Sequence, residues 1–138
     1  MRRQSKKTAA RENIVRPILD GLKLELGSCE ICGSSKRRLE AHEIARGSHR
    51  SKARGKLFAS LIVCITCHRE LDDTRAWPHA RQLGVLKRSR PKDFDLAAFN
   101  ALVGSGPNRI TEAEVAEMMI ESLFTRPIGD GNPFSNLG

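Results

Sequence analysis

The chain has 138 residues, a length typical of one domain with short flanking segments. Hydrophobic residues make up 39% and charged residues 29%, which is enough apolar surface for a core, while five Phe, one Trp and no Tyr argue against a large aromatic pocket. The sequence contains no run of about 18 apolar residues, the length that a membrane-spanning helix needs. The basic N-terminus also lacks the apolar segment of a signal peptide. We therefore expect a soluble, intracellular, cytoplasmic protein with no membrane partner.

The formal charge of +8 is concentrated in the first part of the chain. Residues 1–56 carry 15 basic and 6 acidic side chains, whereas residues 57–138 carry 9 basic and 10 acidic ones. This asymmetry is typical of proteins that bind a polyanion, because each Lys or Arg that neutralises a phosphate releases a condensed counterion. Nucleic acid is the expected partner, and a basic face that is merely solvated is the alternative.

The first segments are a basic arm and a helix. Residues 1–7 contain four cations and predict a mobile arm. Residues 8–26 place apolar side chains at helical spacing and predict an amphipathic helix, for which Pro17 offers a second starting point. The folded domain is expected to span 8–103.

All four cysteines occur in two Cys-x-x-Cys motifs, Cys29 to Cys32 and Cys64 to Cys67, separated by 31 residues. In a reducing compartment such pairs favour one tetrahedral Zn²⁺ over disulfides, and Gly33 supplies the flexible backbone that such a turn needs. Because sulfur would fill all four positions, this zinc is expected to be structural. Redox-active or simply buried cysteines are the alternative.

The interval between the two motifs predicts a strand, a loop, a second strand and a helix. Leu39, Ala41 and Ile44 suggest a strand that ends near His42 and Glu43. A basic loop with Gly and Ser follows over 46–56. The apolar run 57–63 leads into the second cysteine pair, and 68–73 can begin a helix.

The stretch from Cys29 to about Asp73 resembles the HNH endonuclease superfamily, whose ββα-metal motif lies between two zinc-binding Cys-x-x-Cys pairs. Its segments CEIC, AHEI and SLIVCITCH match the family pattern of a cysteine pair, a metal ligand followed by a base, and a second cysteine pair followed by His. The resemblance implies a core motif over 29–73. It also implies that the chain hydrolyses phosphodiester bonds in DNA, in the processing of phage or mobile-element DNA.

The resemblance assigns roles to three side chains. His42 and His68 fall on the positions that ligate a catalytic divalent ion, Mg²⁺, Mn²⁺ or Ni²⁺, and Glu43 falls on the general-base position. The family's base is usually His, and its asparagine has no counterpart here, Ser60 being the nearest polar residue. His49 is the alternative base. The cations expected to bind nucleic acid are Arg37, Arg38, Arg46, Arg50, Lys52, Arg54 and Lys56.

The second half of the chain predicts three further helices. One begins at Trp77-Pro78 and runs through Lys87, with Trp77 as a core anchor. Asp95 can cap a helix through Val103, and the linker and C-terminal helix are expected over 104–124, where Thr111 and Glu114 form a capping box. Residues 125–138 predict a disordered tail. His79 is expected to be a surface or packing residue.

These expectations combine into an α+β, predominantly helical fold: a small zinc-stabilised ββα-metal core with flanking helices. The expected function is a metal-dependent HNH-type DNA endonuclease. One alternative is a catalytically silent, zinc-dependent DNA-binding or regulatory protein. Another is a zinc-stabilised module that binds a protein partner through the acidic helix over 111–124.

Overall fold

The structure is a computed structural model that describes residues 6–45, 49–104 and 109–121, and its fold is mixed α+β and mostly helical. The predicted fold class is confirmed at this level, whereas most of the predicted arm and all of the tail over 125–138 lie outside the described residues. The elements in chain order are α1 (Lys6–Leu26), β1 (Leu39–Glu43), α2 (His49–Ala53), the 3₁₀ turn η1 (Leu57–Ala59), β2 (Ser60–Cys64), α3 (Ile65–Glu70), α4 (His79–Ser89), α5 (Leu96–Val103) and α6 (Glu112–Glu121).

The two strands form an antiparallel pair in which Leu39 lies opposite Cys64 and Glu43 lies opposite Ser60. Because successive side chains of a strand point to opposite faces, His42 shares one face with its partner Leu61. Every residue of β2 is buried, whereas β1 is mostly half-buried. The side of β1 away from β2 is therefore the more exposed edge of the sheet.

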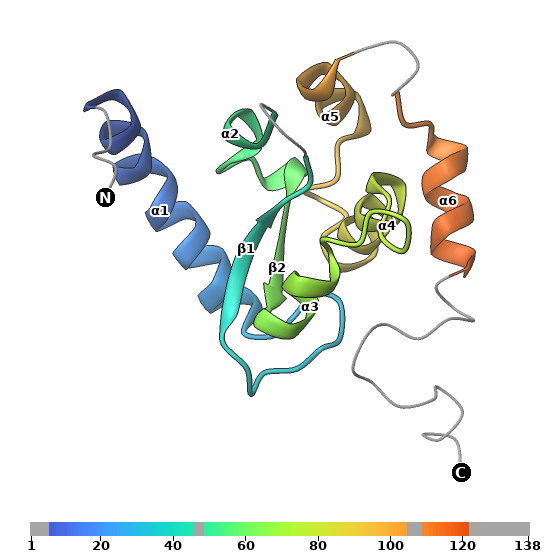
Figure 1. Cartoon of the computed structure of the whole chain (residues 1–138), viewed down its shortest axis with the longest axis horizontal. Coiled ribbons are helices and arrows are strands. Elements are labelled where there is room, and N and C mark those ends of the chain that lie inside the picture. Colours follow the sequence, from blue (N-terminus) through green and yellow to red (C-terminus); the bar gives the residue numbers. More distant parts are fainter. Residues whose placement is uncertain (1–5, 46–48, 105–108, 122–138) are drawn as a thin grey trace.

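Helices cover both faces of this hairpin (Figure 1). α1 packs on one face with Val15, Leu19 and Leu22 buried, while α3 and α4 contact the hairpin as well. α1 continues through Pro17 without a break. Pro17 is exposed, so the carbonyl that loses its helical hydrogen bond can be solvated, and the lost bond does not end the helix.

The main core lies between the hairpin and the C-terminal helices. Trp77 is 2% exposed, which confirms it as a core anchor, and it packs in one cluster with Leu83, Phe99 and Val115. α6 packs on α4, so its apolar side faces the core. The predicted caps are confirmed: the Ala98 amide donates to Asp95 and the Glu114 amide donates to Thr111, at 3.0 and 3.1 Å.

Three predicted boundaries were wrong by a few residues, and one predicted loop contains a helix. The basic segment 46–56 contains the helix α2, and β2 is preceded by η1 rather than extending back to Leu57. α3 begins at Ile65 instead of 68, because the Cys64 sulfur accepts from the Cys67 amide and acts as the N-cap. α4 begins at His79, with Pro78 as its N-cap.

A buried ion pair connects the first cysteine turn to the end of α4. Glu30 accepts from Arg90 Nε at 2.7 Å and from the Ile62 amide at 2.7 Å, and Arg90 also donates to the Ser60 carbonyl. The side chains of Glu30 and Arg90 are 2% and 7% exposed. This pair therefore fixes the cysteine turn against β2. Within the described ranges, no helix combines the length and apolar character needed to cross a bilayer.

Candidate functional site

The four cysteines converge at one end of the hairpin. The sulfur atoms of Cys29, Cys32, Cys64 and Cys67 all lie within 4.8 Å of one another. Two of these sulfurs accept backbone amides three residues on, at 3.5 Å, and Gly33 closes the first turn with φ of 77°. The predicted convergence is confirmed, and this set could hold a metal ion such as zinc.

The cysteines differ in how their surroundings shift the pKa of the thiol. Burial raises the pKa of the Cys67 thiol, as it does that of Cys32. Burial also acts to raise the pKa of Cys64, but hydrogen bonds from the Cys67 amide and other neighbours outweigh it and lower this pKa to about 7. Arg37 lies 4.0 Å from the Cys64 sulfur. The predicted phosphate contact Arg37 thus sits beside the cysteine cluster.

His42 on β1 and His68 on α3 lie face to edge, with ring centroids 5.2 Å apart. His42 is 5% exposed, and burial lowers its pKa, an effect that Gln82 opposes through its hydrogen bond. His68 Nδ1 lies 3.0 Å from Glu40 Oε1, and this hydrogen bond lowers the pKa of Glu40. The structure therefore brings together the two histidines that sequence spacing separates by 26 positions.

The hydrogen bonds define which ring nitrogens carry protons. Gln82 Nε2 donates to the Trp77 carbonyl, so its Oε1 faces His42 Nε2 at 2.8 Å and must accept from it. Glu40 likewise can only accept from His68 Nδ1. In the neutral rings, His42 Nδ1 and His68 Nε2 are therefore the nitrogens with a lone pair. Metal-binding histidines usually have this arrangement, in which the other nitrogen donates to a protein oxygen.

Glu43 is not brought together with the two histidines. It lies next to His42 on β1, so its side chain points to the opposite face of the strand. There Arg54 donates to Glu43 at 3.1 Å and also forms a bidentate ion pair with Glu12 of α1. The predicted base and the predicted phosphate ligand Arg54 are thus engaged with each other and with α1.

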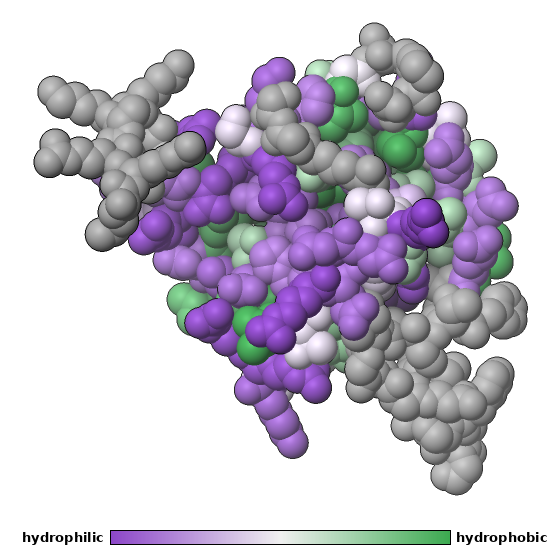
Figure 2. Space-filling model, in the orientation of Figure 1, coloured by the Kyte–Doolittle hydropathy of each residue, from purple (hydrophilic) through white to green (hydrophobic). Residues whose placement is uncertain are grey.

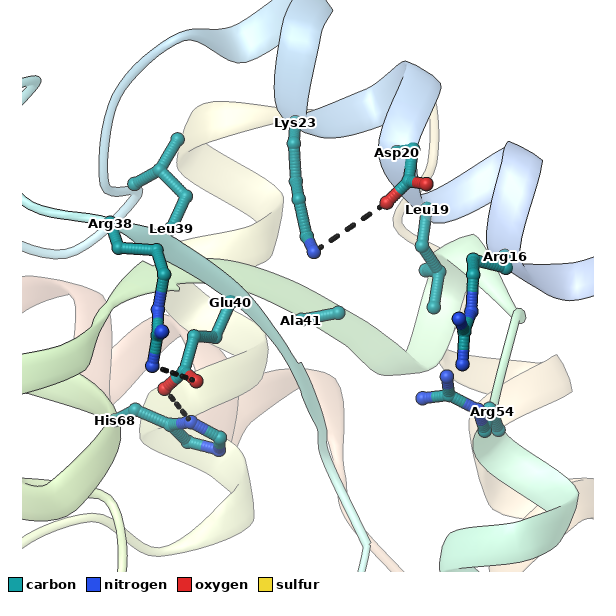
Figure 3. Close-up of a pocket in the computed structure, with 10 residues that line it drawn as sticks. All are labelled: Arg16, Leu19, Asp20, Lys23, Arg38, Leu39, Glu40, Ala41, Arg54 and His68. Atoms are coloured by element: carbon teal, nitrogen blue, oxygen red, sulfur yellow. Dashed lines mark hydrogen bonds and ion pairs between the residues drawn. The ribbon is translucent and has the colours of Figure 1, made fainter. Parts of the chain in front are cut away.

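Two adjoining hollows run along the exposed edge of β1, and we refer to them together as the trough. Their volumes are about 500 and 450 Å³, and both are lined by Arg38, Glu40 and His68. Figure 3 shows Arg16 and Lys23 extending from α1 on the side of the first hollow opposite Arg38 and His68. In Figure 2 the same region of the surface is mostly hydrophilic.

Of the cations expected to bind nucleic acid, Arg38, Arg50 and Arg54 line the trough. Lys52 and Lys56 are exposed, and neither lines either hollow. Arg46 lies outside the described residues. Sequence reasoning missed Arg16 and Lys23, whose helical pattern indicated only a core helix. It also missed Glu40 and Gln82. Finding them would have required knowing how α3 and α4 pack against the hairpin.

Comparison with protein-family models, curated proteins and solved structures finds no match. The geometry of the described residues must therefore carry any assignment of function. Within the described ranges, the cysteine cluster is the only group of three or more His, Cys, Asp or Glu side chains close enough to hold one metal ion.

Proposed function

We propose that this protein is a metal-dependent endonuclease that hydrolyses phosphodiester bonds in DNA, with zinc in the cysteine cluster as a structural ion. One observation carries the proposal: His42 and His68 meet at 5.2 Å beside a cation-lined trough, each with one nitrogen committed to a protein oxygen. Histidines that each donate one ring nitrogen to a protein oxygen are oriented as metal-binding histidines usually are.

The donor set suits a divalent cation with open positions. His42 Nδ1 and His68 Nε2 would hold the ion, and water and a phosphate oxygen would complete its shell. When bound, such an ion neutralises charge on the phosphate and on the leaving oxygen. The protein's part is to keep the two rings oriented, through Gln82 for His42 and through Glu40 for His68.

The trough supports a nucleic-acid backbone as the ligand. Arg16, Lys23 and Arg38 line its first hollow, and Arg50 and Arg69 line the second. Cations on both sides of a hollow that passes His68 would position a phosphate next to the proposed metal site. Their charge would also make binding strongly dependent on salt.

The general base has two candidates, Glu43 and His49. The carboxylate of Glu43 accepts a hydrogen bond from Arg54 on the face of β1 that points away from the histidines. His49 Nδ1 is buried without a hydrogen-bond partner in the structure, so this nitrogen is uncommitted. This nitrogen is closed to solvent and His49 lines neither hollow, so both residues stay candidates for the group that accepts a proton from the attacking water.

A DNA-binding protein without hydrolysis is the second candidate function. Each ring already bonds a protein partner through one nitrogen, and no third His, Cys, Asp or Glu of the described residues joins them as a metal ligand set. In this case the trough would bind DNA while the histidines only stabilise the hairpin against α3 and α4.

A plasmid-nicking assay with Mg²⁺, Mn²⁺ or Ni²⁺ separates these candidates. We expect wild-type protein to nick DNA, and His42→Ala or His68→Ala to lose more than about 100-fold in rate, since even the outer partners of metal ligands contribute about 10- to 100-fold. Lys92→Ala, at an exposed position outside the trough, is the matched control and should keep full activity. Binding without any cleavage, under all three metals, would establish the second candidate instead.

The contribution of the trough is measured separately by binding. Arg16→Ala and Lys23→Ala should each weaken DNA binding and reduce its salt dependence by about one counterion, whereas Lys92→Ala should not. The base is tested by comparing Glu43→Gln with His49→Gln. A rate that survives His49→Gln but not Glu43→Gln would assign the role to Glu43, and the reverse result would assign it to His49.

A further inference from the structure

α1 carries a second apolar face, opposite the one that packs on the hairpin. The described part of the chain exposes four large hydrophobic side chains, and three of them are on this helix: Ile14, Ile18 and Leu24, at 68%, 43% and 85% exposed. The fourth is Ile120 of α6, at 60%. Concentration of exposed apolar side chains on one element is typical of an interaction surface, whereas isolated ones are ordinary.

These side chains belong to one continuous stripe, which we call the outer face of α1. At about 100° per residue, its members fall within an arc of about 120°. All are exposed, and a Cβ built on Gly21 would meet no atom within 4 Å, so the stripe is open to solvent. The outer face comprises Ala10, Ile14, Pro17, Ile18, Gly21 and Leu24.

We propose that a second copy of this chain covers the outer face, with the two α1 helices antiparallel and related by a two-fold axis near Ile18. The charges beside the stripe identify the occupant. Arg11 and Glu25 each lie about 20° around the helix from Ile18, which forms one edge of the stripe, and seven residues before and after it, about 10 Å along the axis in each direction. A two-fold axis at Ile18 places Arg11 of each copy level with Glu25 of the other.

Other arrangements lack this complementarity. Parallel helices related by a two-fold axis would place Arg11 of each copy on opposite edges of the contact and far from Glu25, and a lipid surface or an unrelated apolar partner would need no opposed charges. Both side chains are exposed: Glu25 forms no ion pair within the described ranges, and Arg11 donates a 3.4 Å hydrogen bond to the Ser51 carbonyl. Since they are about 21 Å apart on one helix, they cannot pair within one copy.

The sizes of the side chains agree with the same arrangement. With Ile18 on the axis, Ile14 of one copy lies within about 2 Å, along the helix, of the level of Gly21 of the other. Leu24 lies within about 3 Å of the level of Ala10. Each large side chain thus meets a small one, and Ile18 meets its own copy, which allows the helices to approach closely.

The experiment measures the mass of the full-length protein by sedimentation or light scattering over roughly 1 to 200 µM, a range that detects micromolar association. We expect a concentration-dependent dimer of twice the 15.3 kDa chain. Ile18→Glu should be monomeric at every concentration, while Ile120→Glu, the matched control on α6, should dimerise like the wild type. Circular dichroism verifies that each variant keeps its helices.

A charge exchange tests the antiparallel arrangement itself. Arg11→Glu and Glu25→Arg should each raise the dimer dissociation constant by about tenfold or more. The double variant, in which both pairs re-form with exchanged signs, should recover most of the wild-type affinity. A monomeric wild type, an Ile18→Glu variant that still dimerises, or a double variant no better than the single ones would each overturn the proposal. Nuclease activity enters none of these readouts, so the proposed function stands or fails independently.

Discussion

The orientation of His42 depends on a single amide. Gln82 is 4% exposed, accepts from His42 and donates to the Trp77 carbonyl. Gln82→Leu would leave both groups buried without partners, at a cost of about 1–3 kcal/mol in the free energy of unfolding. It would also remove the acceptor that keeps the proton on Nε2. We predict that ¹⁵N shifts of the His42 ring will change from one tautomer to a mixture, with a parallel loss of any nuclease activity.

The chain offers a matched control for this substitution. Asn100 is also an amide that bonds to backbone at both ends, at 2.8 and 2.9 Å to Ile110, away from the histidines. Asn100→Leu should cost similar stability and leave the His42 signals unchanged. An unaltered tautomer in Gln82→Leu would show that something other than this amide orients the ring.

At the scale of elements, Arg54 connects α1 to the hairpin by bonding Glu12 and Glu43. Its hydrogen bond lowers the pKa of Glu12 from 4.5, so the folded state holds fewer protons than the unfolded state as pH falls. The stabilisation is therefore complete above about pH 4.5 and is lost as pH falls through the lower folded value. We predict that Glu12→Gln costs about 1–3 kcal/mol at neutral pH, measured by urea unfolding.

The same ion pair determines how the difference in stability between the wild type and Glu12→Gln varies with pH. Below pH 4.5 the wild type and Glu12→Gln should converge in stability, because protonated Glu12 no longer attracts Arg54 as an anion. Glu117→Gln, an exposed carboxyl on α6, should match the wild type at every pH. A stability difference that does not shrink in acid would mean that the pair contributes through packing alone.

The elements that could be predicted from the sequence are those specified by residues close together in the chain. Cysteine spacing, the alternation around Leu39 and the caps Asp95 and Thr111 are local patterns, and the structure contains each of them. α2 was missed because its five residues, rich in cations, show no helical pattern of their own. The helix packs against α5, a contact that the local sequence does not reveal.

The position of a site residue could be predicted only where nearby residues in the chain determine it. The meeting of His42 and His68 followed from a motif. The role of Gln82, 40 positions from His42, depends on how α4 packs on β2. Glu43 was expected beside His42 because the two are adjacent in sequence, yet adjacency on a strand turns side chains apart. Sequence patterns thus named the elements of the site more reliably than its hydrogen bonds.

At the scale of the whole molecule, the cysteine cluster joins the turn after α1 to β2 and α3, segments that the Glu30–Arg90 pair and the packing of α3 on the hairpin also hold together. One pair lies in the turn after α1, and the other joins β2 to α3, which carries His68. Because burial raises the pKa of Cys67, a metal ion would also compensate for thiolates that the core disfavours. We predict one tightly bound zinc per chain. At free zinc about a thousandfold above its dissociation constant, the ion should add about 4 kcal/mol to the free energy of unfolding.

The measurement is elemental analysis together with thermal unfolding before and after dialysis against a chelator. Cys64→Ser should lose the zinc and unfold at lower temperature, whereas Ser35→Ala, at an exposed position between the two pairs, should behave as the wild type. A chelator would also remove a divalent ion from the histidines, so His68→Ala distinguishes the two sites: it should keep its zinc and most of its stability while losing activity. A metal-free wild type that unfolds at the same temperature as the zinc-loaded protein would contradict the structural role of the cluster, because the core alone would then position α3 against β1.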